Sequence, residues 1–333
     1  MKLIKPPALG PGARLAIVTN ASALTASEEA VERGYARLRA RGFEVVEAAN
    51  CRTEVGHTAG AIRERVKALH ACFRSRKVDG ILNFWGGYQS HQLLEHLDLD
   101  LIRRRPKAFI GYSDTTALQV ALLARVGLVS FSGPAGISFA KPTVPDFTWE
   151  HFERVLVRGE AGVALGTAAE FSDNPWFKDP EGKMRFEANP GWKIYRGGEA
   201  RGPIVGGNLG TMLLLAGTPY WPKLKGAVLF VEEDESERPE TVDRMFTQLR
   251  HMGVYDQIAG MVVGRFSRAV GFKDGDTLEK ILDDALRGHR FPVILDADFG
   301  HTDPLLTIPL GVRCRVSTKK PEIVLEEAAV TRG

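Results

Sequence analysis

The stretch KAFIGYSDTTALQVALLARVG, residues 107–127, places a short apolar strand directly before an apolar helix. Between them stand Ser113, Asp114 and Thr115, residue types that favour the start of a helix. A serine on a sharp strand-to-helix turn also exposes its hydroxyl and leaves the first helical N–H groups free to bind an oxyanion. Ser113 is therefore either a nucleophile or a helix cap, and this stretch alone leaves both interpretations open.

The alternation of strand and helix extends outward from this stretch. Short apolar segments typical of strands occupy residues 14–19, 43–49 and 80–85, and amphipathic segments typical of helices occupy residues 26–42, 61–75 and 91–97. Strands that alternate with helices predict a parallel sheet covered on both faces. We assign residues 1–140 to an N-terminal α/β domain that carries Ser113.

The rest of the chain predicts a linker and a second domain. Residues 141–202 contain several prolines and three tryptophans with little periodicity, which indicates a linker with an extended aromatic loop. In residues 203–333, strands and helices alternate again and end in a tail typical of β-strands, from residue 306. The predicted fold class is α/β with two domains, a C-terminal domain with a β-rich tail, and the active site in the cleft between the domains.

Composition limits the possible partners. The chain has 333 residues, 44% of them hydrophobic and 26% charged, with a formal net charge of +3, so nothing indicates nucleic-acid binding. The first apolar run, from Leu15, is too short for a signal peptide or a membrane span, which predicts a cytoplasmic protein without a membrane partner. Three separated cysteines and the lack of metal-binding or dinucleotide motifs predict no metal and no cofactor.

Three further positions are candidates for chemistry. In NFWGGYQ, backbone N–H groups beside Gly87 can form half of an oxyanion hole, or the two glycines simply make a tight turn. Glu232 and Glu233 end an apolar strand, where one of them can orient a histidine, although an acidic solvated loop is the alternative. His301 follows a strand inside a turn that contains Gly300 and Pro304; a structural role remains open for it as a lone histidine.

Segments with these residues, taken in order, resemble the LD-carboxypeptidase family of serine peptidases, which includes the microcin C immunity peptidases. The resemblance rests on KPPALGPGARLAIVT, GGYQSHQLLEHLDLDLIRRRPKAFIGYSDTTAL, GPIVGGNLGTMLLLAGTPYW, GAVLFVEEDESERPETVDRMFTQL and DADFGHTDPLLTIPLG. It implies that Ser113 is the nucleophile, Glu232 the acid and His301 the base. It also implies an oxyanion hole made by the N–H groups of Gly87 and Asp114, and a homodimer.

The family divides by substrate. One branch removes a terminal D-amino acid from murein tetrapeptide, and the other cuts the amide between an aminoacyl or peptidyl group and a nucleotide-like moiety. The segment from residue 170 to 198 resembles the extended loop of the second branch, in which a tryptophan stacks on the nucleobase. Trp176 is the first candidate for that stacking and Trp192 the second, although both can instead anchor the loop. Trp85, where a smaller residue is common, and Asn208 complete the candidate substrate-binding residues.

We therefore expect a cytoplasmic serine peptidase or amidase of the microcin-immunity branch. The alternatives are a murein LD-carboxypeptidase and, from a different class, a non-catalytic protein that binds a ligand in the cleft.

Overall fold

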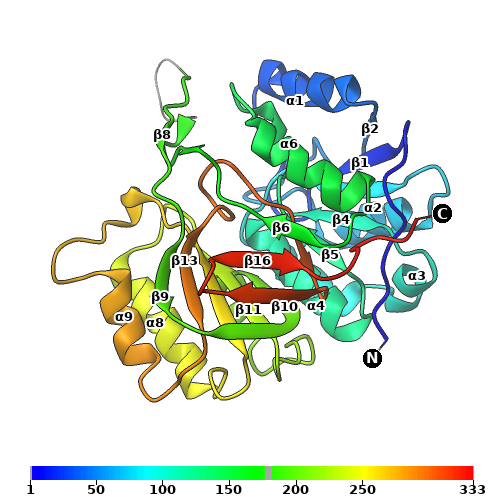
Figure 1. The fold of residues 1–333 in the computed structure, drawn as a ribbon. Helices are drawn as coiled ribbons and strands as arrows, with labels where there is room; N and C mark the ends of the chain where they lie inside the picture. The colour runs from blue at the N-terminus through cyan, green and yellow to red at the C-terminus, as the bar shows by residue number, and fades with distance from the viewer. Residues whose placement is uncertain (1, 177–181, 333) are drawn as a thin grey trace.

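Two β-sheets organise the chain (Figure 1), and the computed structural model describes residues 2–176 and 182–332. The first sheet has six strands in the order β14-β5-β4-β3-β1-β2. Their bounds are β1 Arg14–Val18, β2 Glu44–Glu47, β3 Gly80–Asn83, β4 Ala108–Gly111, β5 Ser130–Ser132 and β14 Ile308–Leu310. The first five strands pair in parallel and β14 pairs antiparallel with β5. The parallel N-terminal sheet predicted from the strand–helix alternation is confirmed.

The second sheet has eight strands in the order β6-β16-β15-β10-β11-β12-β13-β9. Their bounds are β6 Val163–Leu165, β9 Lys193–Arg196, β10 Glu199–Asn208, β11 Val228–Glu232, β12 Gly260–Gly264, β13 Val293–Ala297, β15 Arg313–Ser317 and β16 Glu322–Leu325. Strands β10 to β13 are parallel to one another, and the other pairings are antiparallel. Tail strands β15 and β16 belong to this antiparallel part, as the β-rich tail of the sequence predicts.

Helices lie between the successive parallel strands of both sheets, and two more follow the last parallel strand of the first sheet. In the N-terminal half they are α1 Glu28–Ala40, α2 Ile62–Arg74, α3 Leu99–Arg104, α4 Thr116–Arg125, α5 Gly136–Ala140 and α6 Asp146–Phe152. In the C-terminal half they are α7 Leu209–Leu213, α8 Pro239–His251 and α9 Leu278–Ala285. The short 3₁₀ turns are η1 Ser90–His96, η2 Ser113–Thr115 and η5 Arg268–Val270, and η3 Glu153–Val157 is a π-helical turn.

Helix α4 lies between the two halves of the chain. Its residues from Thr116 to Leu122 are all buried, and it contacts β5 of the first sheet and β10 of the second. A helix that is apolar on every side is expected where both sides are covered by protein. This position explains why the helix after Ser113 lacks a polar face.

The chain crosses between the sheets near its C-terminal end. Strand β14 follows the second sheet's β13 in sequence but completes the first sheet beside β5. Its central residue, Pro309, is compatible with an edge strand because proline cannot donate to a second neighbour. The edge of the first sheet is therefore supplied by the half of the chain that forms the second.

Residues 141–202 contain more structure than their sequence indicates. They include α6, the strands β6 and β9, the start of β10 and a two-stranded sheet of β7 Glu170–Phe171 and β8 Glu187–Ala188. Strands of two to four residues are too short to give a readable period. The second sheet thus draws on the segment expected to be a linker, whose residues 177–181 lie outside the described ones.

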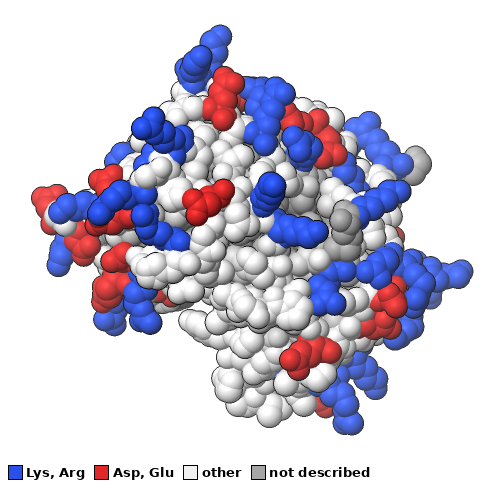
Figure 2. Space-filling view, turned by 90° about the horizontal axis from the view of Figure 1, so that it is seen from below, with Lys and Arg blue, Asp and Glu red and all other residues white. Residues whose placement is uncertain are grey.

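Charged side chains of both signs are interspersed on the face seen in Figure 2, with a broad uncharged area between them. This face has no continuous basic surface of the kind that binds nucleic acid. In residues 2–176 and 182–332, no helix is both long and apolar enough to cross a membrane.

Candidate functional site

Ser113 stands on the turn that leads from β4 into α4. All four residues of β4 are buried, Tyr112 continues in an extended conformation, and Ser113 then adopts φ of 62°. A left-handed φ is uncommon for a residue with a Cβ and costs on the order of 1–2 kcal/mol. The strained turn brings the Ser113 side chain to the wall of a cavity rather than onto its own helix. It makes no capping hydrogen bond among the described residues, so the geometry favours the nucleophile interpretation.

Two backbone segments approach Ser113 closely. A Cβ on Gly86 would lie 2.9 Å from Ser113 Oγ and 3.0 Å from the Asp114 nitrogen, so only glycine fits there. Gly87, at φ of 139°, borders one small cavity together with Ser113 and Asp114. As a first helical residue, Asp114 has no intrahelical acceptor for its N–H group. The two expected oxyanion donors therefore lie on the same cavity as Ser113.

Hydrogen bonds from Ser90 hold Asp114 in place. Its Oδ2 accepts a hydrogen bond from the Ser90 nitrogen at 2.9 Å, and its carbonyl oxygen accepts one from Ser90 Oγ at 2.5 Å. Burial raises the pKa of the Asp114 carboxyl above its usual range. These bonds fix the turn that carries the Asp114 N–H group.

His301 lies beside the last residue of β11. Its Nδ1 is 2.7 Å from Oε2 of Glu232, whose side chain is 1% exposed. Burial by itself would lower the pKa of His301, but the Glu232 carboxylate, with Asp234 and Glu235, raises that pKa to about 9. The His301 ring also packs edge-on against Tyr112, with centroids 4.9 Å apart. Among the two adjacent glutamates, Glu232 is thus the one in contact with the histidine.

Glu233 points to the other side of the strand end. Its carboxylate accepts hydrogen bonds from Asn208 Nδ2 at 2.8 Å and from the Gly210 nitrogen. Burial and the neighbouring Glu232 raise the pKa of Glu233 to about 8. Asn208 uses its Oδ1 to accept from the Thr211 nitrogen at 3.0 Å. Asn208 borders the small cavity, but both ends of its amide already have protein partners.

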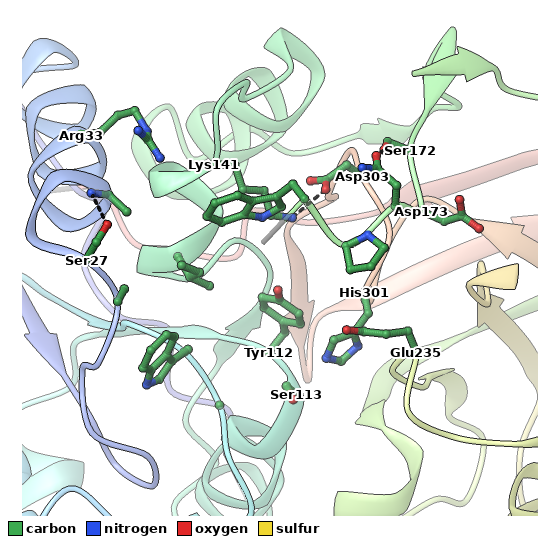
Figure 3. A pocket seen from close by; sticks show the side chains of 18 of the residues that line it. Ser27, Arg33, Tyr112, Ser113, Lys141, Ser172, Asp173, Glu235, His301 and Asp303 are labelled. Atoms are coloured by element: carbon green, nitrogen blue, oxygen red, sulfur yellow. Dashed lines mark hydrogen bonds and ion pairs between the residues drawn. The ribbon is translucent and has the colours of Figure 1, made fainter. Parts of the chain in front are cut away.

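Ser113 borders two cavities of different size and lining. The large cavity, of about 670 Å³, also contains His301, Tyr112 and Trp85. Figure 3 shows Ser113, Tyr112 and His301 gathered on one side of it, with the carboxyl of Glu235 directed toward them. The small cavity, of about 180 Å³, contains the Gly87 and Asp114 backbone. A site with the hydroxyl at the junction of two cavities can hold a substrate on both sides of the bond that is attacked.

The three tryptophans named from the sequence have different positions. Trp85 and Trp176 both line the large cavity, and Trp85 Nε1 donates to the Ser22 carbonyl at 3.2 Å. Trp192 is packed against the main hydrophobic core and lines neither cavity. Of the two candidates on the extended loop, the structure brings Trp176 to the large cavity and places Trp192 against the core.

A buried ion pair in the large cavity had no signal in the sequence. Lys141 Nζ lies 2.6 Å from Asp303 Oδ2, and each side chain is 10% exposed. Burial would lower the pKa of Lys141, but Asp303 and Tyr112 raise it above its ordinary value. The pair joins the end of α5 to the turn after His301 (Figure 3). Its members are 162 residues apart, so no local pattern announces it.

The described residues hold no group of three or more histidine, cysteine, aspartate or glutamate side chains placed to bind a metal ion.

Two family models match the chain: the LD-carboxypeptidase N-terminal domain over residues 15–133 and the LD-carboxypeptidase C-terminal domain over residues 201–316. The chain is 30% identical over 315 residues to the microcin C7 self-immunity protein MccF of Escherichia coli. The aligned residues cover 93% of this chain and 91% of MccF. It is 29% identical over 332 residues to a Bacillus subtilis protein named "Probable murein peptide carboxypeptidase". That alignment covers 99% of this chain and 96% of the relative.

Solved structures agree with these matches. An MccF-like protein from Bacillus anthracis str. Ames has a TM-score of 0.92 at 33% identity, covering 97% of this chain and 99% of that one. A structure of MccF in complex with aspartyl sulfamoyl adenosine has a TM-score of 0.92 at 29% identity, covering 98% and 100%. The predicted two-domain α/β fold is confirmed by these neighbours.

Proposed function

The chain belongs to the LD-carboxypeptidase family of serine peptidases, and on that premise we propose that it hydrolyses the amide between an aminoacyl or peptidyl group and a nucleotide-like moiety. The observation that carries the proposal is the hydrogen bond between Glu232 and His301 at the cavity that Ser113 also borders. The proposed roles are nucleophile for Ser113, general base for His301 and acidic partner for Glu232.

The first chemical step is attack by Ser113. Because Nδ1 of His301 faces Glu232, Nε2 is the nitrogen that takes the proton from Ser113 Oγ as Oγ bonds to the amide carbon. Glu232 stabilises the imidazolium that results. The N–H groups of Gly87 and Asp114 hold the negative oxygen of the tetrahedral intermediate.

The tetrahedral intermediate then collapses. The carbon–nitrogen bond breaks, His301 gives its proton to the departing nitrogen, and the acyl group stays on Ser113 Oγ. A water molecule then attacks the acyl carbon, with His301 again as base, and releases the acid and free Ser113.

The position of His301 indicates where the leaving group binds. His301 must reach the departing nitrogen, and it lines the large cavity, so the nucleotide-like part occupies that cavity. A volume of about 670 Å³ lies within the range of about 300–1,000 Å³ typical of small-molecule sites. Trp176 and Trp85 supply aromatic surface there for a nucleobase. The solved complex of the neighbour MccF with aspartyl sulfamoyl adenosine supports a substrate of this class.

The second candidate function is cleavage of an L,D-peptide bond beside a free D-terminal carboxylate, favoured by the relative from Bacillus subtilis. That carboxylate needs a cation in the large cavity. Lys141 is already paired with Asp303 there, and Arg33 Nε donates to the Ala140 carbonyl at 2.8 Å. Arg244 is exposed on α8 and lies outside the described lining of both cavities. The cavity therefore favours the nucleotide-like leaving group.

Hydrolysis of two substrates by the wild type and Ser113→Ala tests the proposal. An aminoacyl sulfamoyl adenosine should be cut by the wild type and not by the variant, and a murein L,D-tetrapeptide should be cut slowly or not at all. Cleavage of the tetrapeptide alone would select the second function. Failure to cut either substrate would favour a non-catalytic protein that binds a ligand in the cleft, and activity in Ser113→Ala equal to that of the wild type would rule out Ser113 as the nucleophile.

We also propose that the protein is a cytoplasmic homodimer, as the resemblance to its family implies. Light scattering on the purified chain and fractionation of cells that produce it would test the two statements separately.

A further inference from the structure

The small cavity must receive the acyl side of the substrate if the proposed function holds. Ser113 stands at the junction of the two cavities, and His301 lines the large one, where it meets the leaving group. The acyl group lies across the scissile bond from the leaving group, beside the Gly87 and Asp114 backbone in the small cavity. At about 180 Å³ this cavity is smaller than a typical ligand site, so it has room for one side chain.

The lining of the small cavity is acidic on one side. Asp234 and Glu237 border it, and the described lining contains no lysine, arginine or histidine. Asp234 Oδ1 accepts from the Ser236 nitrogen at 2.7 Å, and Glu237 Oε2 accepts from Thr241 Oγ1. The other oxygen of each carboxylate has no partner among the described residues. An ionised carboxylate accepts about four hydrogen bonds, so both retain capacity for a cation.

The lining is apolar on another side. Tyr88 and Leu214 border the same cavity although they are 71% and 52% exposed. Large apolar side chains left this open provide surface for an aliphatic chain, and an aromatic face attracts a cation. An aliphatic stem that ends in an ammonium group matches both kinds of surface.

We propose that the small cavity selects acyl groups with a long aliphatic cationic side chain, such as lysyl, and discriminates against acidic acyl groups. Asp234 and Glu237 are the specificity-determining residues, and Tyr88 and Leu214 contact the methylene chain. This inference rests on the proposed function, because that function decides which cavity holds the acyl group.

Three substrates that differ only in the side chain test the inference: lysyl, norleucyl and glutamyl sulfamoyl adenosine. All carry the same α-ammonium group, and norleucine keeps the straight aliphatic chain of lysine but lacks its terminal ammonium group. Hydrolysis by the wild type is measured as kcat/KM, and binding to Ser113→Ala is measured by calorimetry. We expect the lysyl compound to be preferred at least about tenfold over the norleucyl and more over the glutamyl compound.

Matched variants locate the preference. Glu237→Gln and Asp234→Asn keep the shape of the side chain and should each reduce the lysyl-to-norleucyl ratio of kcat/KM about tenfold, through KM for the lysyl compound. The ratio is the readout because the Asp234 charge also acts on His301, which affects the hydrolysis of both compounds equally. Glu240→Gln is the control, because Glu240 lies on the same segment with its side chain 67% exposed and outside the described cavity lining.

The two measurements separate the two proposals. Equal binding of the three compounds to Ser113→Ala would overturn the inference whether or not hydrolysis occurs. If hydrolysis occurs, a lysyl-to-norleucyl ratio of kcat/KM that is unchanged in both cavity variants would also overturn it. Selective binding without hydrolysis of any compound by the wild type would overturn the proposed function and retain the cation preference of the cavity.

Discussion

His301 Nδ1 lies 2.7 Å from Glu232 Oε2, although Glu232 ends one strand, His301 follows another, and the two residues are 69 positions apart. Burial by itself would lower the pKa of this histidine, but the Glu232 carboxylate together with Asp234 and Glu235 raises that pKa to about 9. Since a general base must be neutral to accept a proton, this contact makes the activity depend on pH over an unusual range for histidine.

We predict that kcat/KM rises with pH through an apparent pKa near 9. Below that pKa His301 is protonated, so kcat/KM should increase about tenfold per pH unit from about pH 6 to 8, reach half of its maximum near pH 9 and become level above about pH 10. Glu235→Gln removes one of the charges that raise this pKa and should move the profile to lower pH. The exposed Glu240→Gln variant should leave it in place, whereas a wild-type profile already level at pH 7 would contradict the prediction.

Gly86→Ala should lower kcat by at least about 100-fold. The added methyl group would meet Ser113 Oγ at 2.9 Å, and a displacement of the nucleophile by about 1 Å can cost that factor. Gly166→Ala is the matched control, because a Cβ there has nothing within 4 Å. Circular dichroism should show both variants folded, and a Gly86→Ala enzyme as active as Gly166→Ala would refute the close approach.

Ser113→Gly should unfold about 1–2 °C above Ser113→Ala. Alanine keeps the cost of a left-handed φ of 62°, on the order of 1–2 kcal/mol, while glycine removes it and adds a smaller entropic cost of about 0.5–1 kcal/mol. Thermal unfolding of the two inactive variants measures the difference. A higher melting temperature for the alanine variant would mean that the turn is not strained.

Breaking the Lys141–Asp303 pair from one side should cost about 3–5 kcal/mol of unfolding free energy, because it leaves a buried charge without its partner. The double variant Lys141→Met with Asp303→Leu should recover most of that loss. Denaturant unfolding of the two single variants and the double variant gives the coupling. The exposed pair of Arg103 with Asp100 is the control, and Arg103→Met should change the free energy by under about 1 kcal/mol.

Trp176→Ala should raise KM for an aminoacyl sulfamoyl adenosine about tenfold and leave kcat nearly unchanged. Base stacking contributes about 1–3 kcal/mol, and its loss should affect ground state and transition state equally. Trp192→Phe is the control because Trp192 lines neither cavity in the described structure. An equal effect of both substitutions would indicate that the loop is merely destabilised.

The sequence was sufficient to predict the parallel sheet and the turn at Ser113, because buried parallel strands and helix N-termini have characteristic local compositions. It was insufficient to choose between Glu232 and Glu233, since a shift of one residue at a strand end reverses which side chain faces the histidine. The sequence also did not predict which way Trp192 faces, because an irregular segment has no hydrophobic periodicity that separates buried from exposed positions.

Long-range features were absent from the local pattern. The ion pair of Lys141 with Asp303 depends on two distant turns meeting, and β14 is a three-residue strand with a central proline. The composition of neither strand predicts that β14 pairs with β5. The acidic and apolar lining of the small cavity likewise comes from four separate segments of the chain.

The late insertion of β14 has a consequence for biosynthesis. Strand β5 ends at Ser132, but the strand that covers its edge begins at Ile308. At about 5–20 residues per second, a ribosome needs roughly 10 to 35 seconds to make the intervening chain. During that time the nascent N-terminal sheet has an unpaired edge of the kind that recruits another chain. We expect the growing polypeptide to depend on chaperones in this interval, and a truncation before residue 308 to aggregate rather than fold.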